Sequence, residues 1–297
     1  MRIGIFMFPS DIDSFVADSK AIASDGFATI WVAQTFGMEM LTAIAVAGRE
    51  VPGINFGTAV VPTYPRHPAT MASLALTAQD ATKGRLLLGI GLSHKVVIDG
   101  MFGMSFDKPA RHMREHLSIL LPLLKEGKVA FEGTTLTFRG SIQVKGASAP
   151  PVLLAALAPE MLKLAGSVAD GTITWMAGPR TVEEHIIPGM APSAAAAGRT
   201  APTTVVGLPF CLTDDADAAR ERAAKEFVIY GHLPSYRAVL DREGAAGPAD
   251  IAVVGGEAAI AAGVQRMADA GADELVASIF GSPEERDRTR AFLKTLI

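Results

Sequence analysis

Cysteine is nearly absent from this chain of 297 residues, because Cys211 is the only one. A single thiol cannot form an intramolecular disulfide, and it cannot supply the thiolates of a cysteine-rich zinc site. No stretch reaches the 18 consecutive apolar residues that a membrane span needs, and the apolar run 3–8 is too short for a signal-peptide core. We therefore expect a cytoplasmic protein with no membrane partner.

The sequence also lacks a strong excess of charge. It has 27 basic and 31 acidic residues, a net charge of -4, and no run rich in lysine and arginine. Proteins that bind nucleic acid usually carry such a basic patch, so we expect no nucleic-acid partner. Hydrophobic residues make up 49% of the chain and charged residues 20%, which suffices for a large core and excludes intrinsic disorder.

Eight short apolar runs alternate with amphipathic segments of helical periodicity. The runs cover residues 2–8, 28–33, 54–61, 86–91, 151–156, 171–176, 203–210 and 274–280. The expected helices cover 13–24, 68–82, 111–125, 160–168, 217–230 and 258–270. Continuous apolar runs are typical of parallel strands that are covered on both faces. Eight such units in a chain of this length predict an α/β fold, a (β/α)8 TIM barrel.

An open doubly wound sheet is the alternative architecture. That fold usually carries a glycine-rich turn after its first strand, whereas residues 8–11 read Phe-Pro-Ser-Asp. The pair Gly89 and Gly91 lacks the third glycine of a dinucleotide motif. We therefore expect one barrel domain over residues 1–297, with insertions near 97–150 and 231–251. Residues 131–150 resemble a hairpin inserted before the fifth strand, and 231–251 shows no clear periodicity.

The ends of the expected strands hold few ionisable groups. Active sites of barrels are built at the carboxyl ends of the strands, and there His94 is the one side chain suited to proton transfer, with Lys95 beside it. Paired carboxylates, a Ser-His-Asp order and a lysine in the sixth strand are all missing. The remaining residues are mostly small and apolar, which favours a flat cofactor that carries its own reactivity.

Two loops after late strands are candidates for a phosphate site. In residues 155–160 a strand leads directly into a helix through small residues, so backbone amides can approach an anion. The loop after the sixth strand adds Gly178 and the cation Arg180, and barrels often bind phosphate with adjacent late loops. The alternative is an ordinary tight turn, in which an inward-pointing Glu160 would repel an anion.

The other histidines have simpler interpretations. We expect His67 to cap the helix that follows it. His112 and His116 share a helix face, but a third ligand is missing, so we expect no metal site. Met101 and Met104 are expected to pack over the mouth of the pocket.

Several motifs resemble those of the bacterial luciferase-like family, specifically its coenzyme F420-dependent oxidoreductase branch. They are Ile30-Trp31-Val32-Ala33, Gly57-Thr58-Ala59-Val60-Val61, His67-Pro68-Ala69, residues 84–91, Phe131-Glu132-Gly133, Ala169-Asp170-Gly171, and residues 254–257 and 270–275. Each motif is loose alone, but their order and spacing cover nearly the whole chain.

The resemblance implies a luciferase-like barrel, often a homodimer, that holds coenzyme F420, or FMN as the alternative, at its C-terminal face. It also implies a cis peptide bond after the third strand, by position Ala59–Val60. The cofactor-binding residues that we expect are Ala59, Val60, Leu92, Ser93, Ala155, Ala156, Leu157, Ala158, Trp175, Gly178 and Arg180.

Two departures from the family pattern bear on the reaction. The sugar-phosphate dehydrogenases of this branch carry Glu in place of His94, and an Asp-His pair in place of Gln34-Thr35. We hypothesise hydride transfer between the deazaflavin C5 and a small organic substrate. His94 would donate or accept the proton, while Gln34 and Ser93 would position ring or substrate. The alternatives are an FMN-dependent luciferase-like monooxygenase and a non-catalytic flavin-binding barrel.

Overall fold

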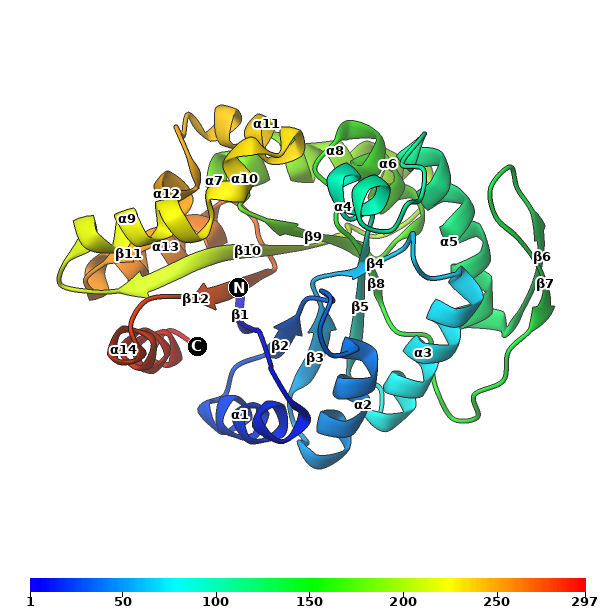
Figure 1. Ribbon diagram of the computed structural model, residues 1–297, viewed down its shortest axis with the longest axis horizontal. Coiled ribbons are helices and arrows are strands. Elements are labelled where there is room, and N and C mark those ends of the chain that lie inside the picture. Colours follow the sequence, from blue (N-terminus) through cyan, green and yellow to red (C-terminus); the bar gives the residue numbers. More distant parts are fainter. The chain divides into compact units, whose positions relative to one another are not determined.

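The computed structural model describes all residues, 1–297, and its elements alternate between strands and helices (Figure 1). The eight strands of the repeat are β1 (Arg2–Met7), β2 (Thr29–Val32), β3 (Asn55–Thr58), β5 (Leu86–Gly91), β8 (Val152–Leu154), β9 (Gly171–Trp175), β10 (Thr203–Leu212) and β12 (Glu274–Ile279). At least one helix follows each of them. This is the predicted (β/α)8 TIM barrel fold.

Internal contacts divide the chain into two compact units. Unit 1 comprises Met1–Met7, Ser24–Trp31 and Ala156–Ile297, and unit 2 comprises Phe8–Ala23 and Val32–Ala155. No helix in either unit is both long and apolar enough to cross a membrane.

In unit 2, β5 is the central strand of a parallel set. It pairs with β3, with the short β4 (Val61–Pro62) and with β8, and only Leu87 along it is not buried. The helices of this unit are α1 (Ile12–Asp25), which ends at the unit boundary, α2 (Met40–Glu50), α3 (Pro68–Ala81), α4 (Lys95–Gly100) and α5 (Pro109–Glu126). Helices α2 and α3 pack against β3 and β5 (Figure 1). Their small, buried alanines let the helices approach the strands closely.

The predicted hairpin is present and begins earlier than expected. Its strands are β6 (Lys128–Glu132) and β7 (Thr137–Ser141), which pair antiparallel with Phe131 opposite Phe138. Glu115 of α5 holds the turn, because its carboxylate accepts the N–H groups of Thr134, Thr135 and Leu136 and the hydroxyl of Thr135. Burial opposes ionisation of Glu115, but these hydrogen bonds outweigh it and lower the pKa to about 2.

In unit 1, β10 is the central strand. It pairs in parallel with β9, with β12 and with the short β11 (Val253–Gly255), and β12 pairs with β1. Near the start of β12, the buried Glu274 accepts a hydrogen bond of 2.7 Å from Trp31 Nε1 and pairs with Arg2 at 3.2 Å. A Cβ on Gly4 would lie 2.7 Å from that carboxylate, so the close approach of these strands requires glycine there.

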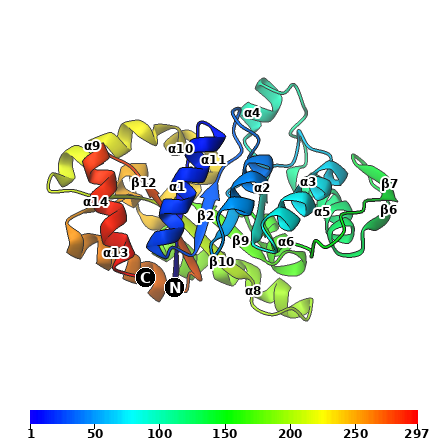
Figure 2. The same ribbon diagram turned by 90° about the horizontal axis from the view of Figure 1, so that it is seen from below.

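The helices of unit 1 are α6 (Pro159–Val168), α7 (Pro179–Thr181), η1 (Val182–Ile186), α8 (Ile187–Ala196), α9 (Ala216–Glu226), α10 (Val228–His232), α11 (Pro234–Glu243), α12 (Pro248–Ile251), α13 (Glu257–Asp269) and α14 (Pro283–Lys294). The predicted ranges 160–168, 217–230 and 258–270 cover α6, α9 with part of α10, and α13, whereas periodicity did not predict the others. Residues 179–196 form one continuous helix with a π-helical segment, η1. Helices α13 and α14 lie side by side (Figure 2).

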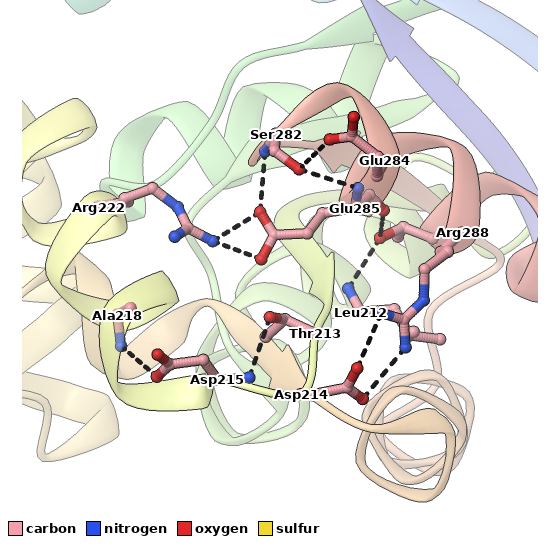
Figure 3. A network of polar contacts seen from close by, with 11 residues as sticks. Leu212, Thr213, Asp214, Asp215, Ala218, Arg222, Ser282, Glu284, Glu285 and Arg288 are labelled. Carbon is pink, nitrogen blue, oxygen red and sulfur yellow. Dashed lines mark hydrogen bonds and ion pairs between the residues drawn. The ribbon is translucent and has the colours of Figure 1, made fainter.

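A polar network ties the end of β10 to α14 (Figure 3). Arg222 donates to both carboxylate oxygens of Glu285, at 2.6 and 2.7 Å, and Arg288 makes two bonds to Asp214, at 3.0 and 3.1 Å. The N–H of Leu212 donates to the Thr289 hydroxyl at 2.7 Å. Since these charged groups satisfy one another, we assign the network a structural role.

Candidate functional site

Strand ends in unit 2 meet tightly around Gly91. A Cβ built on Gly91 would lie 2.6 Å from Val60 Cγ2 and 3.0 Å from the Ala155 Cβ. The N–H of Ala155 donates to Ile90 O, and that of Thr63 to Gly91 O, each at 2.9 Å. The structure therefore brings together the predicted Val60 and Ala155, with no room for a side chain between them.

Residues Ala59 and Val60, between β3 and β4, do not belong to either strand. The peptide bond Ala59–Val60 is cis, at the position that the family resemblance implies. The N–H of Ala59 donates to Val32 O at 2.7 Å, and that of Gln34 to Val60 O at 3.3 Å. Ala59 and Val60 are half-buried, whereas Thr58 and Val61 on either side are buried. Contact of these two residues with a cofactor ring stays a prediction.

Leu92, Ser93 and His94 lead from β5 into α4. Ser93 has a φ of 60°, in the left-handed region that non-glycine residues seldom adopt. The backbone carbonyl of His94 accepts the N–H groups of Val97 and Ile98, both at 2.9 Å, so the start of α4 fixes this residue. Burial lowers the pKa of His94 below its ordinary value of 6.5. At neutral pH the imidazole is therefore neutral, with one donor and one acceptor nitrogen.

Gln34 organises the loop in front of α2. Its Oε1 accepts the N–H of Met40 at 2.9 Å, and its Nε2 donates to Thr35 O at 2.8 Å and to Met38 O at 3.4 Å. Both amide hydrogens are used in this loop, which leaves one lone pair on Oε1 for a ligand. The predicted role of Gln34 in positioning ring or substrate is not tested by these contacts.

Exposed apolar side chains gather around α4 and the loop before α2. The rings of Phe36 and Phe102 stack at 5.7 Å, and both are exposed. Met101 and Met104, predicted to pack over the pocket mouth, are also exposed, as is Val96.

The histidines of α5 lie in an aromatic stack. The ring of His112 stacks on Tyr64 at 3.8 Å, and its Nε2 lies 3.1 Å from the hydroxyl of Thr63. Burial, and then the charges of Asp99 and Asp107, raise the pKa of Tyr64 to about 12. His116 is fully buried, and burial is the main cause that lowers its pKa to about 3.

The predicted cap of α3 is confirmed. The Nδ1 of His67 accepts the N–H of Ala69 at 3.2 Å.

In unit 1, Ala156, Leu157 and Ala158 lead into α6. Ala158 is the N-cap residue, and no side chain caps this helix. The ring of His185, in η1, lies 2.7 Å from the carbonyl of Leu157. His185 was not predicted, because a contact across 28 residues leaves no local signal in the sequence.

Trp175 ends β9 inside an aromatic cluster. Its ring centroid lies 6.3 Å from Phe6, 6.0 Å from Phe227 and 5.9 Å from Tyr230. Tyr236 of α11 packs edge-on against Tyr230 at 4.9 Å. Burial raises the pKa of both tyrosines, so their hydroxyls stay protonated at neutral pH. Neither tyrosine was among the predicted site residues.

The second predicted phosphate loop already holds a carboxylate. Gly178 is the N-cap of the helix over residues 179–196, and Glu243 of α11 accepts the N–H of Thr181 there. Arg180, predicted as the cation of this loop, is exposed and pairs with Glu184 one turn along, at 2.9 Å. Its contact with a cofactor stays a prediction.

A family model described as luciferase-like monooxygenase matches residues 1–295. The chain is 29% identical, over 259 residues, to a 5,10-methylenetetrahydromethanopterin reductase of Methanolobus tindarius, covering 86% of this chain and 78% of that protein. A coenzyme F420-dependent tetrahydromethanopterin reductase from Methanopyrus kandleri has a TM-score of 0.82 at 22% identity, over 99% of this chain and 97% of that one. An F420-dependent secondary alcohol dehydrogenase has a TM-score of 0.83 at 17% identity, over 100% and 98%. The match to the family model confirms the resemblance, and the chain belongs to the luciferase-like monooxygenase family.

Proposed function

We propose that this protein is a coenzyme F420-dependent oxidoreductase that transfers a hydride between the deazaflavin C5 and a small organic substrate. The observation that carries the proposal is the arrangement of strand ends in unit 2. There Val60, Gly91 and Ala155 pack closely, and the neutral His94 lies three residues along the chain from Gly91. Membership of the luciferase-like family and the F420-dependent enzymes among its relatives support the choice of cofactor.

The residues of unit 2 fit a flat, largely apolar ring. Ala59 and Val60 are half-buried and carry no charge, and Gly91 admits no side chain between Val60 and Ala155. A surface of this kind favours burial of a planar ring. Bound F420 would supply the carbon that gives or accepts a hydride, and these residues would support its ring.

The residues of unit 1 fit the phosphate-bearing part of the cofactor. The start of α6 has no side-chain cap, so no side chain offsets the positive end of its helix dipole. The hydroxyl of Thr181, at the start of the second helix, is buried without a hydrogen-bond partner. We assign Ala156, Leu157 and Ala158 to this role, because the Glu243 carboxylate already occupies the helix start at Gly178.

His94 would hold the proton that accompanies the hydride. When a hydride adds to a polar double bond of the substrate, the more electronegative atom needs a proton, and the reverse reaction releases one. A neutral imidazole with a lowered pKa can accept that proton, and the imidazolium can return it.

Anaerobic turnover with the labelled cofactor tests this function. Reduced F420 that carries deuterium at C5 is mixed with the protein and a panel of small ketones, aldehydes and activated alkenes. We expect one class to oxidise the cofactor and to take the label onto carbon. Oxygen consumption with reduced FMN, and no label transfer from F420, would instead establish the monooxygenase alternative.

A further inference from the structure

Phe36 and Phe102 form an exposed pair of stacked rings beyond the ends of two strands. Phe36 lies four residues after β2, and Phe102 lies two residues after α4, the helix that follows β5. Their ring centroids are 5.7 Å apart with planes inclined by 29°, so the loop before α2 lies beside α4 (Figure 2). Phe36 is 62% exposed and Phe102 is 40% exposed, so each ring keeps a surface that a ligand can contact. Loops after the carboxyl ends of strands are where barrels bind their substrates.

Two exposed methionines flank Phe102 in the chain. Met101 precedes it and Met104 follows two residues later. The N–H of Phe102 donates to Val97 O at 3.1 Å, and that of Met104 donates to Ile98 O at 3.0 Å, so the turn is held against α4. Ile98 is fully buried and anchors the helix. Because thioethers make favourable contacts with ring edges, this turn suits an aromatic ligand.

The charge and the size of this surface fit a small neutral molecule. The two ionisable residues of α4, Lys95 and Asp99, form an ion pair with each other, so the helix presents no net charge. A stable protein interface takes about 20–30 residues from each partner. The large exposed apolar residues here are only Phe36, Val96, Met101, Phe102 and Met104.

Helix α4 connects this surface to His94. His94 is the N-cap residue of α4, and its carbonyl accepts the N–H groups of Val97 and Ile98. The helix has six residues and therefore spans about 9 Å, at about 1.5 Å per residue. A substrate that reacts beside His94 can reach the two rings with a group of about that length.

We propose that the substrate carries an aromatic ring and that Phe36 and Phe102 bind it, an inference that rests on the proposed function. The reacting carbon would lie about 9 Å from that ring, near His94. Aromatic pairs are stabilised beyond the burial of their area, by an amount equivalent to about two- to tenfold in affinity. A saturated ring of similar size also buries apolar surface but lacks this stabilisation. The two phenylalanines therefore select aromatic over saturated substrates.

Matched pairs of substrates separate ring stacking from apolar burial. The probes are methyl ketones that carry either a phenyl or a cyclohexyl group, with spacers of increasing length between ring and carbonyl. If only aldehydes or activated alkenes oxidise reduced F420, the same pairs are made in that class. At the preferred spacer length we expect kcat/KM to be about two- to tenfold higher for the phenyl compound. Equal values, or higher values for the cyclohexyl compound, would overturn the proposal.

Leucine substitutions test whether the two rings cause this preference. Phe36→Leu and Phe102→Leu each remove a ring but keep an apolar side chain. We expect the phenyl preference to fall below about twofold in both, while kcat/KM for the cyclohexyl compound changes by less than about threefold. Phe138→Leu is the control, the same exchange in β7, where Phe138 contacts His67 at 5.8 Å. It should keep the wild-type preference. An unchanged preference in Phe36→Leu and Phe102→Leu would contradict the assignment.

Binding without turnover distinguishes failure of this inference from failure of the proposed function. If no compound of the panel oxidises reduced F420, the proposed function is wrong. Calorimetric titration of the protein with a phenyl ketone and with its cyclohexyl counterpart then decides the role of the two rings. Tighter binding of the phenyl ketone that is lost in Phe102→Leu supports it. Equal binding of both ketones, or binding of neither, contradicts it.

Discussion

Single residues set the chemistry that this protein can perform. His94 lies three residues after the end of β5, so its place at a strand end could be predicted from the sequence. Glu243, His185 and the stack of Tyr64 on His112 could not, because each contact joins residues that are distant in the chain. Local patterns report neighbours in sequence, whereas these side chains meet only after folding.

The first prediction concerns proton transfer by His94. We choose His94→Gln, because glutamine removes the imidazole ring and has no group that can donate or accept a proton near neutral pH. Glutamate would also remove the ring but would keep a titrating group. We expect kcat/KM for hydride transfer to fall by about 10²–10⁴-fold, the usual contribution of a general acid or base. The affinity for F420 should change by less than about threefold in the same variant. The substitution removes the proton-transferring group, but it leaves the residues proposed to support the deazaflavin ring in place.

The pH dependence follows from the direction of the pKa shift. Burial lowers the pKa of His94 below 6.5, so the neutral, proton-accepting form persists to a lower pH than for a free histidine. In the direction of substrate oxidation, activity should decline only as the pH falls through this lowered pKa. A pH–rate profile of His94→Gln that keeps the same acidic limb as the wild type would exclude His94 as the base.

The second prediction concerns the packing around Gly91. A methyl group at Gly91→Ala would collide with Val60 and Ala155, and overpacking of this kind costs about 1–3 kcal/mol of unfolding free energy. Gly100→Ala is the control, because Gly100 ends α4 with no atom within 4 Å of an added Cβ. Urea unfolding should show a loss in the first variant and none in the second. Equal stability of the two variants would show that the strand ends can separate without cost.

At the scale of elements, the helices with an apolar stripe were predicted closely. Helix α3 begins at Pro68, after the His67 cap, and the predicted range 68–82 exceeds it by one residue. Helix α11 was missed, since only Val239 and Leu240 are buried along it and no apolar period results. The predicted helix 217–230 is instead two helices, α9 and α10, because Phe227 ends the first.

The third prediction concerns the hairpin of β6 and β7. Glu115 accepts four hydrogen bonds from the turn, so Glu115→Gln should lower the unfolding free energy by about 1–3 kcal/mol at pH 7. Ser118→Ala, one turn further along the exposed side of α5, is a suitable control.

The sign of the pH effect can be stated from the same shift. The pKa of Glu115 falls from 4.5 to about 2 on folding, so its contribution is complete above 4.5 and is lost as the pH drops towards 2. The difference in unfolding free energy between wild type and Glu115→Gln should therefore shrink as the pH falls from about 5 towards about 2, the range over which Glu115 takes up its proton. A difference that does not depend on pH would mean that folding leaves the pKa of Glu115 unchanged.

At the scale of the whole molecule, the order of strands and helices could be predicted from the periodicity of the sequence. The identity of the cofactor could not. Continuous apolar runs identify parallel strands, and eight of them indicate the barrel. We expect the choice between F420 and FMN to depend on a few contacts to the ring and the phosphate, made by residues that are distant from one another in the chain. Periodicity carries no information on such contacts, so the family motifs had to supply the expectation.

Parallel fluorescence titration of the purified protein with F420 and with FMN tests the central claim most directly. We predict saturable binding of F420 at micromolar concentration or below, and weaker binding of FMN. Tighter binding of FMN than of F420, or saturable binding of neither, would contradict the assignment of this protein as an F420-dependent oxidoreductase.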